Sequence, residues 1–170
     1  VIRLLWQGGS QSHEGANYTV AHARLYTLPE ELPALLVAAA GPESARLAGQ
    51  LGDGLISTSP DKKLIQSYRS AGGQGTSHYG QFAVCWAADE TTARKTAQTY
   101  WPTAAVPGEL SQELPLPRHF EQASQKVTED DVAEVIVCGP DPERHRAKVK
   151  EYVDAGFDHV YVHQIGPDQE

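Results

Sequence analysis

The spacing of apolar positions along the chain predicts strands and helices in alternation. Residues 33–40 are almost entirely apolar and have the length of a strand that is buried on both faces. Gly41 and Pro42 follow at once, and from 45 to 51 apolar residues recur at helical spacing until Gly52. This stretch is therefore predicted to form a strand, a tight turn and a helix.

The alternation continues towards the end of the chain. Further strands are predicted over 54–59, 81–87 and 160–164, and further helices over 62–71, 89–100, 129–135 and 141–155. This order requires right-handed crossovers and a parallel sheet. Four such strands do not close a barrel, and a complete eight-stranded α/β barrel needs about 250 residues. The pattern thus predicts either an open sheet or half of a larger barrel.

Two stretches depart from this alternation. Residues 10–31 are polar, with Tyr18 and Val20 at alternating positions, and are predicted to form a hairpin insertion. Residues 101–127 contain four prolines and are too long and irregular for an ordinary barrel connection. We expect this longer stretch to be a lid over the mouth of the barrel, and a solvated surface decoration is the alternative.

Composition narrows the classes of function. The 14 Lys and Arg against 22 Asp and Glu give a net charge of −8, which repels nucleic-acid phosphates, so no nucleic-acid partner is expected. No apolar run reaches the roughly 18 residues of a membrane span and no signal peptide opens the chain, so we expect a cytoplasmic protein without a membrane partner. Cys85 and Cys138 lack CxxC spacing and are expected to be buried and reduced. His159 and His163 have no third ligand at a fixed spacing, so no metal is expected.

The two ends of the sequence look interrupted. The chain has no methionine, even at position 1, and residues 1–6 read as the end of an amphipathic helix without a start signal. The sequence stops shortly after the predicted strand 160–164. We expect residues 1–170 to form a single partial domain of a longer protein, hereafter the parent protein.

Two sequence segments resemble a known family. Residues 37–45 (VAAAGPESA) and 51–56 (LGDGLI) are similar to the luciferase-like monooxygenase superfamily, and more narrowly to its deazaflavin-dependent branch related to coenzyme F420-dependent glucose-6-phosphate dehydrogenases. Further matches lie at 111–115, 137–143 and 154–160, so the resemblance covers essentially the whole chain. It implies an α/β fold, the C-terminal half of a (β/α)8 TIM barrel, with the hairpin before the fifth strand and the lid-like insertion 101–127 after the seventh helix.

The resemblance also implies a function. It indicates an oxidoreductase that transfers a hydride between an organic small-molecule substrate and coenzyme F420, with FMN as the second choice of cofactor. In the resembled family the main acid/base residues lie in the first half of the barrel, so no catalytic residue is assigned and the chain alone is expected to be inactive. The parent protein is expected to be a homodimer. Two alternatives stay open, an FMN-dependent luciferase-like monooxygenase and a small non-catalytic α/β module that binds an anion at the Gly41 turn.

The turn after the first buried strand is the candidate cofactor site. It opens a helix, whose unpaired N–H groups and dipole favour a phosphate or a carboxylate. The resemblance implies that this turn holds the phosphate-bearing tail of the cofactor, and an ordinary strand-to-helix turn is the alternative. The cofactor-binding candidates, with backbone N–H groups rather than the Glu43 carboxylate as donors, are Ala38, Ala40, Gly41, Glu43 and Ser44.

The substrate-binding candidates are Thr58, Ser111 and His163. Thr58 ends a predicted strand, where the active sites of TIM barrels lie, and its hydroxyl would either bond a substrate oxygen or cap the next helix. Ser111 belongs to the lid-like insertion. His163 ends the last strand, and Trp86 and Gln164 are further candidates for the pocket wall.

The expected substrate is not glucose 6-phosphate. Sugar-phosphate-oxidising members of the resembled branch clamp the substrate phosphate with two lysines, an arginine and a threonine, and ungapped matching places Asp61, Ser111, Val135 and Thr58 at those positions. The threonine alone is retained. An acidic and an apolar side chain make a poor clamp for a dianion.

Overall fold

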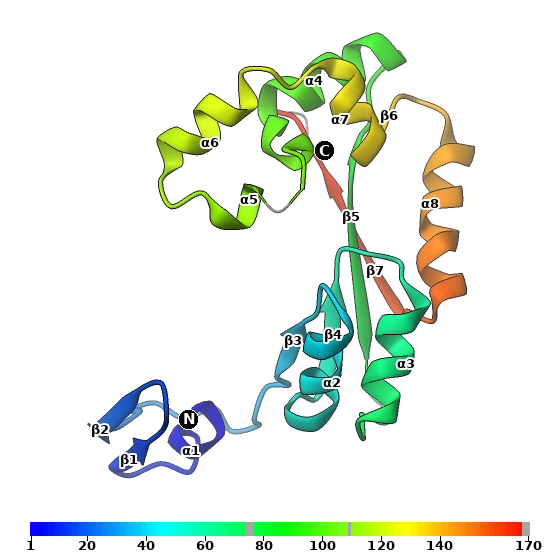
Figure 1. Cartoon of the computed structure of the whole chain (residues 1–170). Coiled ribbons are helices and arrows are strands. Elements are labelled where there is room, and N and C mark those ends of the chain that lie inside the picture. Colours follow the sequence, from blue (N-terminus) through cyan, green and yellow to red (C-terminus); the bar gives the residue numbers. More distant parts are fainter. Residues whose placement is uncertain (74–76, 109, 168–170) are drawn as a thin grey trace. The chain divides into compact units, whose positions relative to one another are not determined.

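The structure, a computed structural model, describes residues 1–73, 77–108 and 110–167, and the chain divides into two compact units, 1–35 and 36–170. The first unit contains a short helix and an antiparallel hairpin (Figure 1), which are α1 (Ile2–Leu5), β1 (Gln11–Glu14) and β2 (Thr19–Ala23). The hairpin predicted within residues 10–31 is confirmed.

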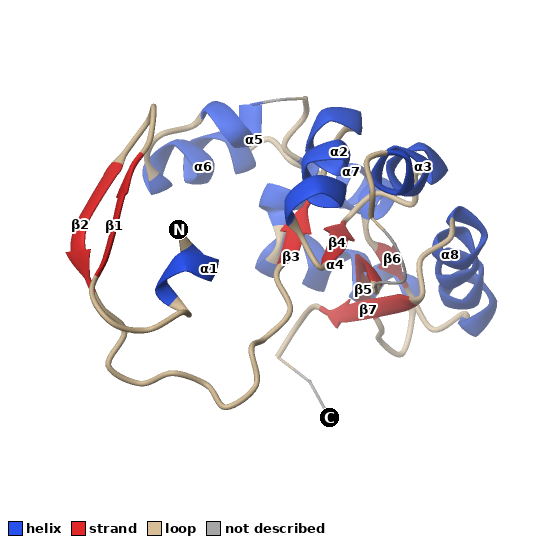
Figure 2. Cartoon of the chain, turned by 90° about the horizontal axis from the view of Figure 1, so that it is seen from below, coloured by secondary structure: helices blue, strands red, loops and turns tan. Residues whose placement is uncertain are grey.

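The second unit is built on a parallel sheet. Its elements are β3 (Leu36–Ala38), α2 (Pro42–Leu51), β4 (Gly54–Ser57), α3 (Lys62–Ser70), β5 (His78–Cys85), α4 (Glu90–Tyr100), the 3-10 helix η1 (Pro102–Ala105), α5 (Leu110–Glu113), α6 (Pro117–Ser124), α7 (Glu129–Val135), β6 (Val137–Cys138), α8 (Pro142–Ala155) and β7 (His159–Gln164). Within the described ranges the sheet has five strands, and β5 at its centre pairs with β4, β6 and β7. Helices α2, α3 and α8 lie on one side of it (Figure 2). The predicted alternation and the parallel sheet are confirmed.

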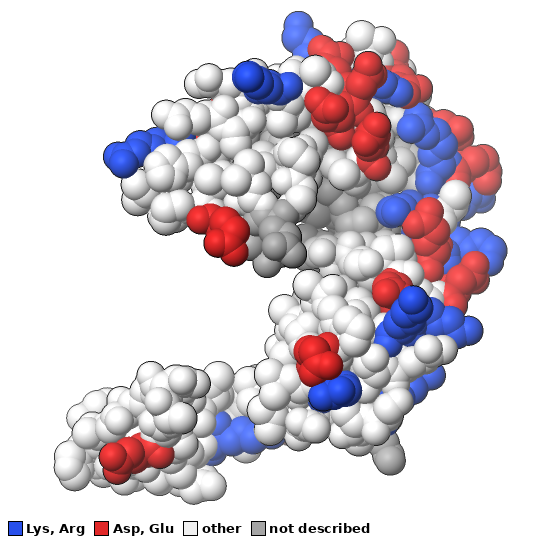
Figure 3. Space-filling model, viewed as in Figure 1, with Lys and Arg blue, Asp and Glu red and all other residues white. Residues whose placement is uncertain are grey.

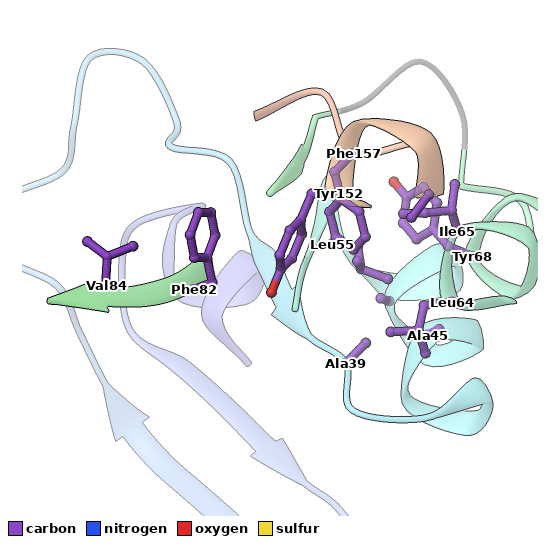
Figure 4. Packing of buried hydrophobic residues seen from close by; sticks show 12 residues of the cluster. Ala39, Ala45, Leu55, Leu64, Ile65, Tyr68, Phe82, Val84, Tyr152 and Phe157 are labelled. Carbon is purple, nitrogen blue, oxygen red and sulfur yellow. The ribbon is translucent and has the colours of Figure 1, made fainter. Parts of the chain in front are cut away.

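Alternate residues of β5 pack against this helical layer. Gly80, Phe82 and Val84 are buried, and the Phe82 ring stacks on the Tyr152 ring of α8 with 5.6 Å between centroids. Figure 4 shows Tyr152 among residues of β4, β5 and the α8–β7 turn, in the apolar cluster that joins the sheet to its helices. A side chain at position 80 would overlap the Tyr152 ring, so glycine is required where the helix approaches the strand.

A second apolar cluster lies at the carboxyl end of β5, where α4, α7 and β6 meet it. Cys85 and Cys138 belong to this cluster and are register partners on β5 and β6. Both are free cysteines and both are buried, as predicted. Burial raises the pKa of the Cys138 thiol to about 11, so that this thiol stays protonated at neutral pH.

Three strands begin at residues other than those predicted, and β7 does so by a single residue, at His159. The apolar run 33–40 forms a strand over Leu36–Ala38 alone, because its partner β4 begins at Gly54, opposite Leu36. Strand β5 begins at His78 rather than at residue 81. There Asp158 accepts hydrogen bonds from the His78 backbone N–H at 3.0 Å and from its ring Nδ1 at 3.1 Å, which ties the start of β5 to the start of β7.

Strand β6 was not predicted, and the expected number of four strands was wrong by one. The strand comprises only Val137 and Cys138, which pair with Val84 and Cys85. Two residues show no periodicity, so a strand of this length cannot be distinguished from a loop in the sequence.

The sheet is open at both edges. In the part of the chain that the structure describes, β3 pairs with β4 alone and β7 pairs with β5 alone. On the sheet face opposite the helices, Leu36 is 38% and Tyr161 is 62% exposed. A closed barrel would cover these side chains and pair both edges, so the arrangement fits half a barrel.

The 170-residue chain on its own is expected to self-associate rather than to melt as a monomer. Open strand edges and an exposed apolar inner layer both promote aggregation. Calorimetry combined with size-exclusion chromatography measures this, and the parent protein under the same conditions should melt sharply. A sharp, cooperative transition of a monomeric 170-residue chain would contradict the prediction.

Candidate functional site

Two cavities meet at the carboxyl ends of β3 and β4. The turn cavity, of about 390 Å³, is lined by Ala38, Ala39, Ala40, Ser44, Ile56, Ser57, Thr58 and Gln81. The strand cavity, of about 600 Å³, is lined by Thr58, Gln81, Phe82, Ala83, Trp101, Ala104, Glu134, Val135, Lys148, Tyr152 and His163. Since Thr58 and Gln81 line both, the cavities adjoin there. In Figure 3 charged side chains gather over the outer helices of the second unit, and its hollowed side shows few of them.

The turn between β3 and α2 is stabilised by hydrogen bonds between Gly41 and Ser44. Gly41 has an extended backbone, with φ −152° and ψ 174°, and Pro42 begins the helix. The Ser44 hydroxyl accepts a hydrogen bond from the Gly41 N–H at 3.2 Å and donates one to the Gly41 carbonyl at 2.9 Å. The first helical bond runs from the Ala45 N–H to the same carbonyl, so the N–H groups of Glu43 and Ser44 precede it and point out of the first turn.

Gly41 is therefore not required here for a left-handed conformation. A Cβ built on Gly41 meets nothing within 4 Å, so the space beside this residue is open. The Glu43 carboxylate is 82% exposed and pairs with Arg46 at 3.0 Å, and it does not line the turn cavity. The space beside the turn is therefore open at Gly41, although Gly41 itself does not line the turn cavity.

Tyr152 fixes the place where the two cavities adjoin. Its hydroxyl lies 2.8 Å from the carbonyl oxygens of both Thr58 and Gln81, one residue beyond the end of β4 and in the middle of β5. Burial raises the pKa of Tyr152 to about 12, so the hydroxyl stays protonated and able to donate. The alternative role of Thr58 as a helix cap is excluded, because Asp61 caps α3 by accepting the Lys63 N–H at 2.8 Å.

His163 is held by the first residue of the insertion. Its ring meets the Trp101 ring edge to face, with 5.1 Å between centroids, and both residues line the strand cavity. Trp101 directly follows α4 and precedes η1, so the contact joins the start of the 101–127 segment to β7. That this segment acts as a lid stays a prediction.

Besides Gly41 and Glu43, three further candidates line neither cavity. Ser111 is exposed on α5. The Gln164 side chain accepts the Trp86 N–H at 3.0 Å and donates to the Trp86 carbonyl at 3.3 Å, so it joins the ends of β5 and β7. The structure thus brings Ala38, Ala40, Ser44 and Thr58 to one cavity and Thr58 and His163 to the other. The candidates that line neither cavity are Gly41, Glu43, Ser111, Trp86 and Gln164.

A comparison with known protein families shows to which of them the chain belongs. The luciferase-like monooxygenase family matches residues 1–159. The chain belongs to this family. Two of its similar relatives are F420-dependent glucose-6-phosphate dehydrogenases: that of Microbacterium testaceum (strain StLB037) is 29% identical over 182 residues, and that of Mycolicibacterium gilvum (strain PYR-GCK) is 29% identical over 181 residues. The matches cover 100% and 99% of this chain and 54% of each relative, so the chain spans about half the length of the curated relatives it matches.

Solved structures share the luciferase-like fold. An F420-dependent secondary alcohol dehydrogenase in complex with an F420-acetone adduct has a TM-score of 0.78 at 23% identity, over 98% of this chain and 54% of its own. The coenzyme F420-dependent tetrahydromethanopterin reductase from Methanopyrus kandleri has a TM-score of 0.65 at 19% identity, over 99% and 56%. The prediction of half a luciferase-like TIM barrel is confirmed.

Two residues of this candidate site escaped the sequence analysis. Gln81 carried a signal, because it is a polar residue at the start of the apolar run 81–87. Tyr152 carried none, because it occupies an ordinary apolar position of a helix and acts on residues far away in the chain. Among the described residues, no group of three His, Cys, Asp or Glu is placed to hold a metal ion, and no helix is long and apolar enough to cross a membrane.

Replacing Tyr152 by Phe is expected to weaken the luciferase-like fold at this site. The ring stays, but the hydroxyl that the Thr58 and Gln81 carbonyl oxygens share as donor is lost, so the free energy of unfolding of the parent protein should fall by about 1–3 kcal/mol. Urea denaturation measures the change. Tyr100→Phe, at an exposed tyrosine that ends α4, is the control and should change stability by less than about 0.5 kcal/mol. Equal stabilities of the Tyr152→Phe and wild-type proteins would contradict the role of the hydroxyl.

Proposed function

We propose that this chain is the C-terminal half of an F420-dependent oxidoreductase, which transfers a hydride between an organic substrate and the deazaflavin. The observation that carries the proposal is the turn cavity, since Ala38, Ala40 and Ser44, named from the family motif, line it together with Thr58. Relatives named as F420-dependent enzymes match the chain along its whole length. Bound F420 would supply the ring that accepts or gives the hydride.

The residues of the turn cavity fit the acidic tail of such a cofactor. The N–H groups of Glu43 and Ser44 and the positive end of the α2 dipole attract a phosphate, and Pro42 contributes no donor. The open space at Gly41 lets the tail approach the backbone, and the Glu43 carboxylate is drawn away by Arg46. Ala38 and Ile56 give this cavity apolar walls.

The strand cavity fits the substrate. Thr58 offers a hydroxyl, Gln81 an amide and His163 an imidazole, and these groups orient an oxygen of the substrate. The Tyr152 hydroxyl holds the Thr58 and Gln81 backbones in place from the helical side of the sheet. Trp101 packs on His163 and helps to exclude water from the cavity. No catalytic residue is assigned among the residues of this chain.

FMN is the second candidate cofactor. A type II Baeyer-Villiger monooxygenase component from Pseudomonas putida, solved in complex with FMN, has a TM-score of 0.53 at 16% identity over 94% of this chain and 53% of its own. This likeness supports the shared fold alone, and the relatives of higher identity favour F420.

A cytoplasmic location agrees with two buried free thiols. A homodimeric parent protein stays a prediction.

Replacing Gly41 by Val tests the cofactor site. The branched side chain would occupy the open space beside the turn, so the dissociation constant for F420 in the parent protein should rise at least about tenfold. Titration with F420, followed by its fluorescence, measures this, and Gly41→Ala should give a smaller loss. The melting temperature should stay unchanged, because nothing lies within 4 Å of the added Cβ. Equal dissociation constants for all three proteins would place the anion site elsewhere.

The parent protein is also expected to oxidise glucose 6-phosphate poorly. Of the positions that match the phosphate clamp, Asp61 is anionic and caps α3, Ser111 lies outside the strand cavity, and Val135 lines that cavity without charge. Each missing cation costs about 1.5–3 kcal/mol, so three together imply an at least roughly thousandfold lower kcat/KM. Assays beside the Microbacterium testaceum relative measure the ratio, and comparable turnover would contradict the prediction.

A further inference from the structure

Two buried thiols lie where a layer of helices joins the sheet. The helices α4, η1, α5, α6 and α7, hereafter the insertion layer, lie between β5 and β6 in the chain. Cys85 is the last residue of β5 and Cys138 is the last residue of β6. The two cysteines therefore stand at the two ends of the insertion layer, and both are free and buried.

The side chains of the two cysteines lie on the same face of the sheet. Cys85 and Cys138 are register partners on neighbouring parallel strands, which places their Cα atoms about 4.8 Å apart. The preceding residues, Val84 and Val137, contact the apolar cluster under α2, α3 and α8, whereas both cysteines belong to the second cluster. Disulfides span Cα separations of about 4.4–6.8 Å, so the backbone already meets the distance that a disulfide requires.

The first and last helices of the insertion layer are held to each other. Arg94 of α4 pairs with Asp130 of α7 at 2.6 Å. The Gln98 side chain of α4 donates to the Val127 carbonyl, just before α7, at 2.8 Å. A bond between the two cysteine sulfurs would close the segment 85–138, with the whole insertion layer in it, into a covalent ring.

We propose that Cys85 and Cys138 are a redox-sensitive pair, in which a low-molecular-weight disulfide is the oxidant and the resulting Cys85–Cys138 disulfide holds the insertion layer on the sheet. One cysteine thiolate attacks a sulfur of the oxidant, forms a mixed disulfide and releases one thiolate of the oxidant. The second cysteine thiolate attacks the cysteine sulfur of this mixed disulfide and releases the other thiolate. The two cysteines lose two electrons, the oxidant gains them, and the two thiol protons pass to the released thiolates.

Burial of the two thiols sets both the product and the rate of this oxidation. Cys85 is 0% and Cys138 is 1% exposed, so the packed cluster has no room for a bound fragment of the oxidant, and packing favours the attack by the second cysteine. Burial raises the pKa of Cys138 to about 11, so thiolate is scarce and the oxidation is slow at neutral pH. The pair is therefore reduced at rest. This inference goes beyond hydride transfer and does not depend on the cofactor.

The first test exposes the reduced parent protein to oxidised glutathione at about pH 9, where thiolate is more abundant. The remaining thiols are then blocked in denaturant, and tryptic peptides are analysed by mass spectrometry without a reducing agent. Trypsin cleaves after Lys and Arg, which places Cys85 in peptide 70–94 and Cys138 in peptide 127–144. We expect one linked species that is lighter by two hydrogen atoms than the two peptides together. Peptides that stay unlinked, or that carry glutathione alone, would overturn the proposal.

Amide hydrogen exchange measures whether the disulfide holds the insertion layer. In the oxidised parent protein the amides of α4 and α7 should exchange at least about tenfold more slowly than in the reduced protein, because the covalent ring restricts the separated conformations of the layer. Helix α2 lies outside the ring and is the internal control, whose exchange should change less. Unchanged exchange in α4 and α7 of the linked protein, or equal slowing in α2, would show that the disulfide does not hold the layer.

Replacing one cysteine separates the disulfide from other actions of the oxidant. Cys138→Ala keeps a small apolar side chain in the second cluster, and oxidised glutathione should leave its exchange in α4 and α7 unchanged. Cys85→Ala should behave in the same way, so that either variant decides if the other does not fold. Dithiothreitol should restore fast exchange in the oxidised wild-type protein. Slowing by the oxidant in a folded variant to the same extent as in the wild-type protein would overturn the assignment to this pair.

Discussion

One buried hydroxyl, that of Tyr152, fixes the backbone of the two residues that line both cavities of the candidate site. Tyr152 comes from α8, which covers one face of the sheet, and its hydroxyl reaches the backbone carbonyl oxygens of Thr58 and Gln81. Those carbonyls lie where β4 has ended and β5 continues, so they lack a ladder partner between these two strands. The ring can come this close because residue 80 is a glycine. Helix packing, strand spacing and cavity shape therefore depend on the same side chain.

Local signals were sufficient to predict much of the fold and to name some of the residues that line the two cavities. The glycine and proline after the apolar run 33–40 favour the β3–α2 turn through their own backbone properties. Of the five residues named there, Ala38, Ala40 and Ser44 line the turn cavity, and Gly41 and Glu43 do not. Thr58 was found because it ends a strand, and strand ends of a parallel sheet converge at one edge. These inferences need no knowledge of the rest of the molecule.

The positions of the remaining residues depend on tertiary contacts, which local sequence patterns do not predict. Gln81 reads as part of a buried strand, and its role depends on where β4 stops beside it. Trp101 reads as the first residue of an irregular segment, and the structure places its ring against His163, which lies far away in the chain. Ser111 was expected at the substrate but lies on an exposed short helix, because a resemblance fixes the order of residues in an insertion and not its path in space.

The reactivity of the two cysteines can report on opening of the apolar cluster at the carboxyl end of β5. Cys85 and Cys138 face each other across β5 and β6 inside the second apolar cluster, and burial raises the pKa of both thiols. A buried, protonated thiol reacts slowly with alkylating reagents, which attack the thiolate. Labelling of either residue therefore requires this cluster to open. The rate of alkylation would measure how often α4 and α7 separate from β5, which contributes to the strand cavity.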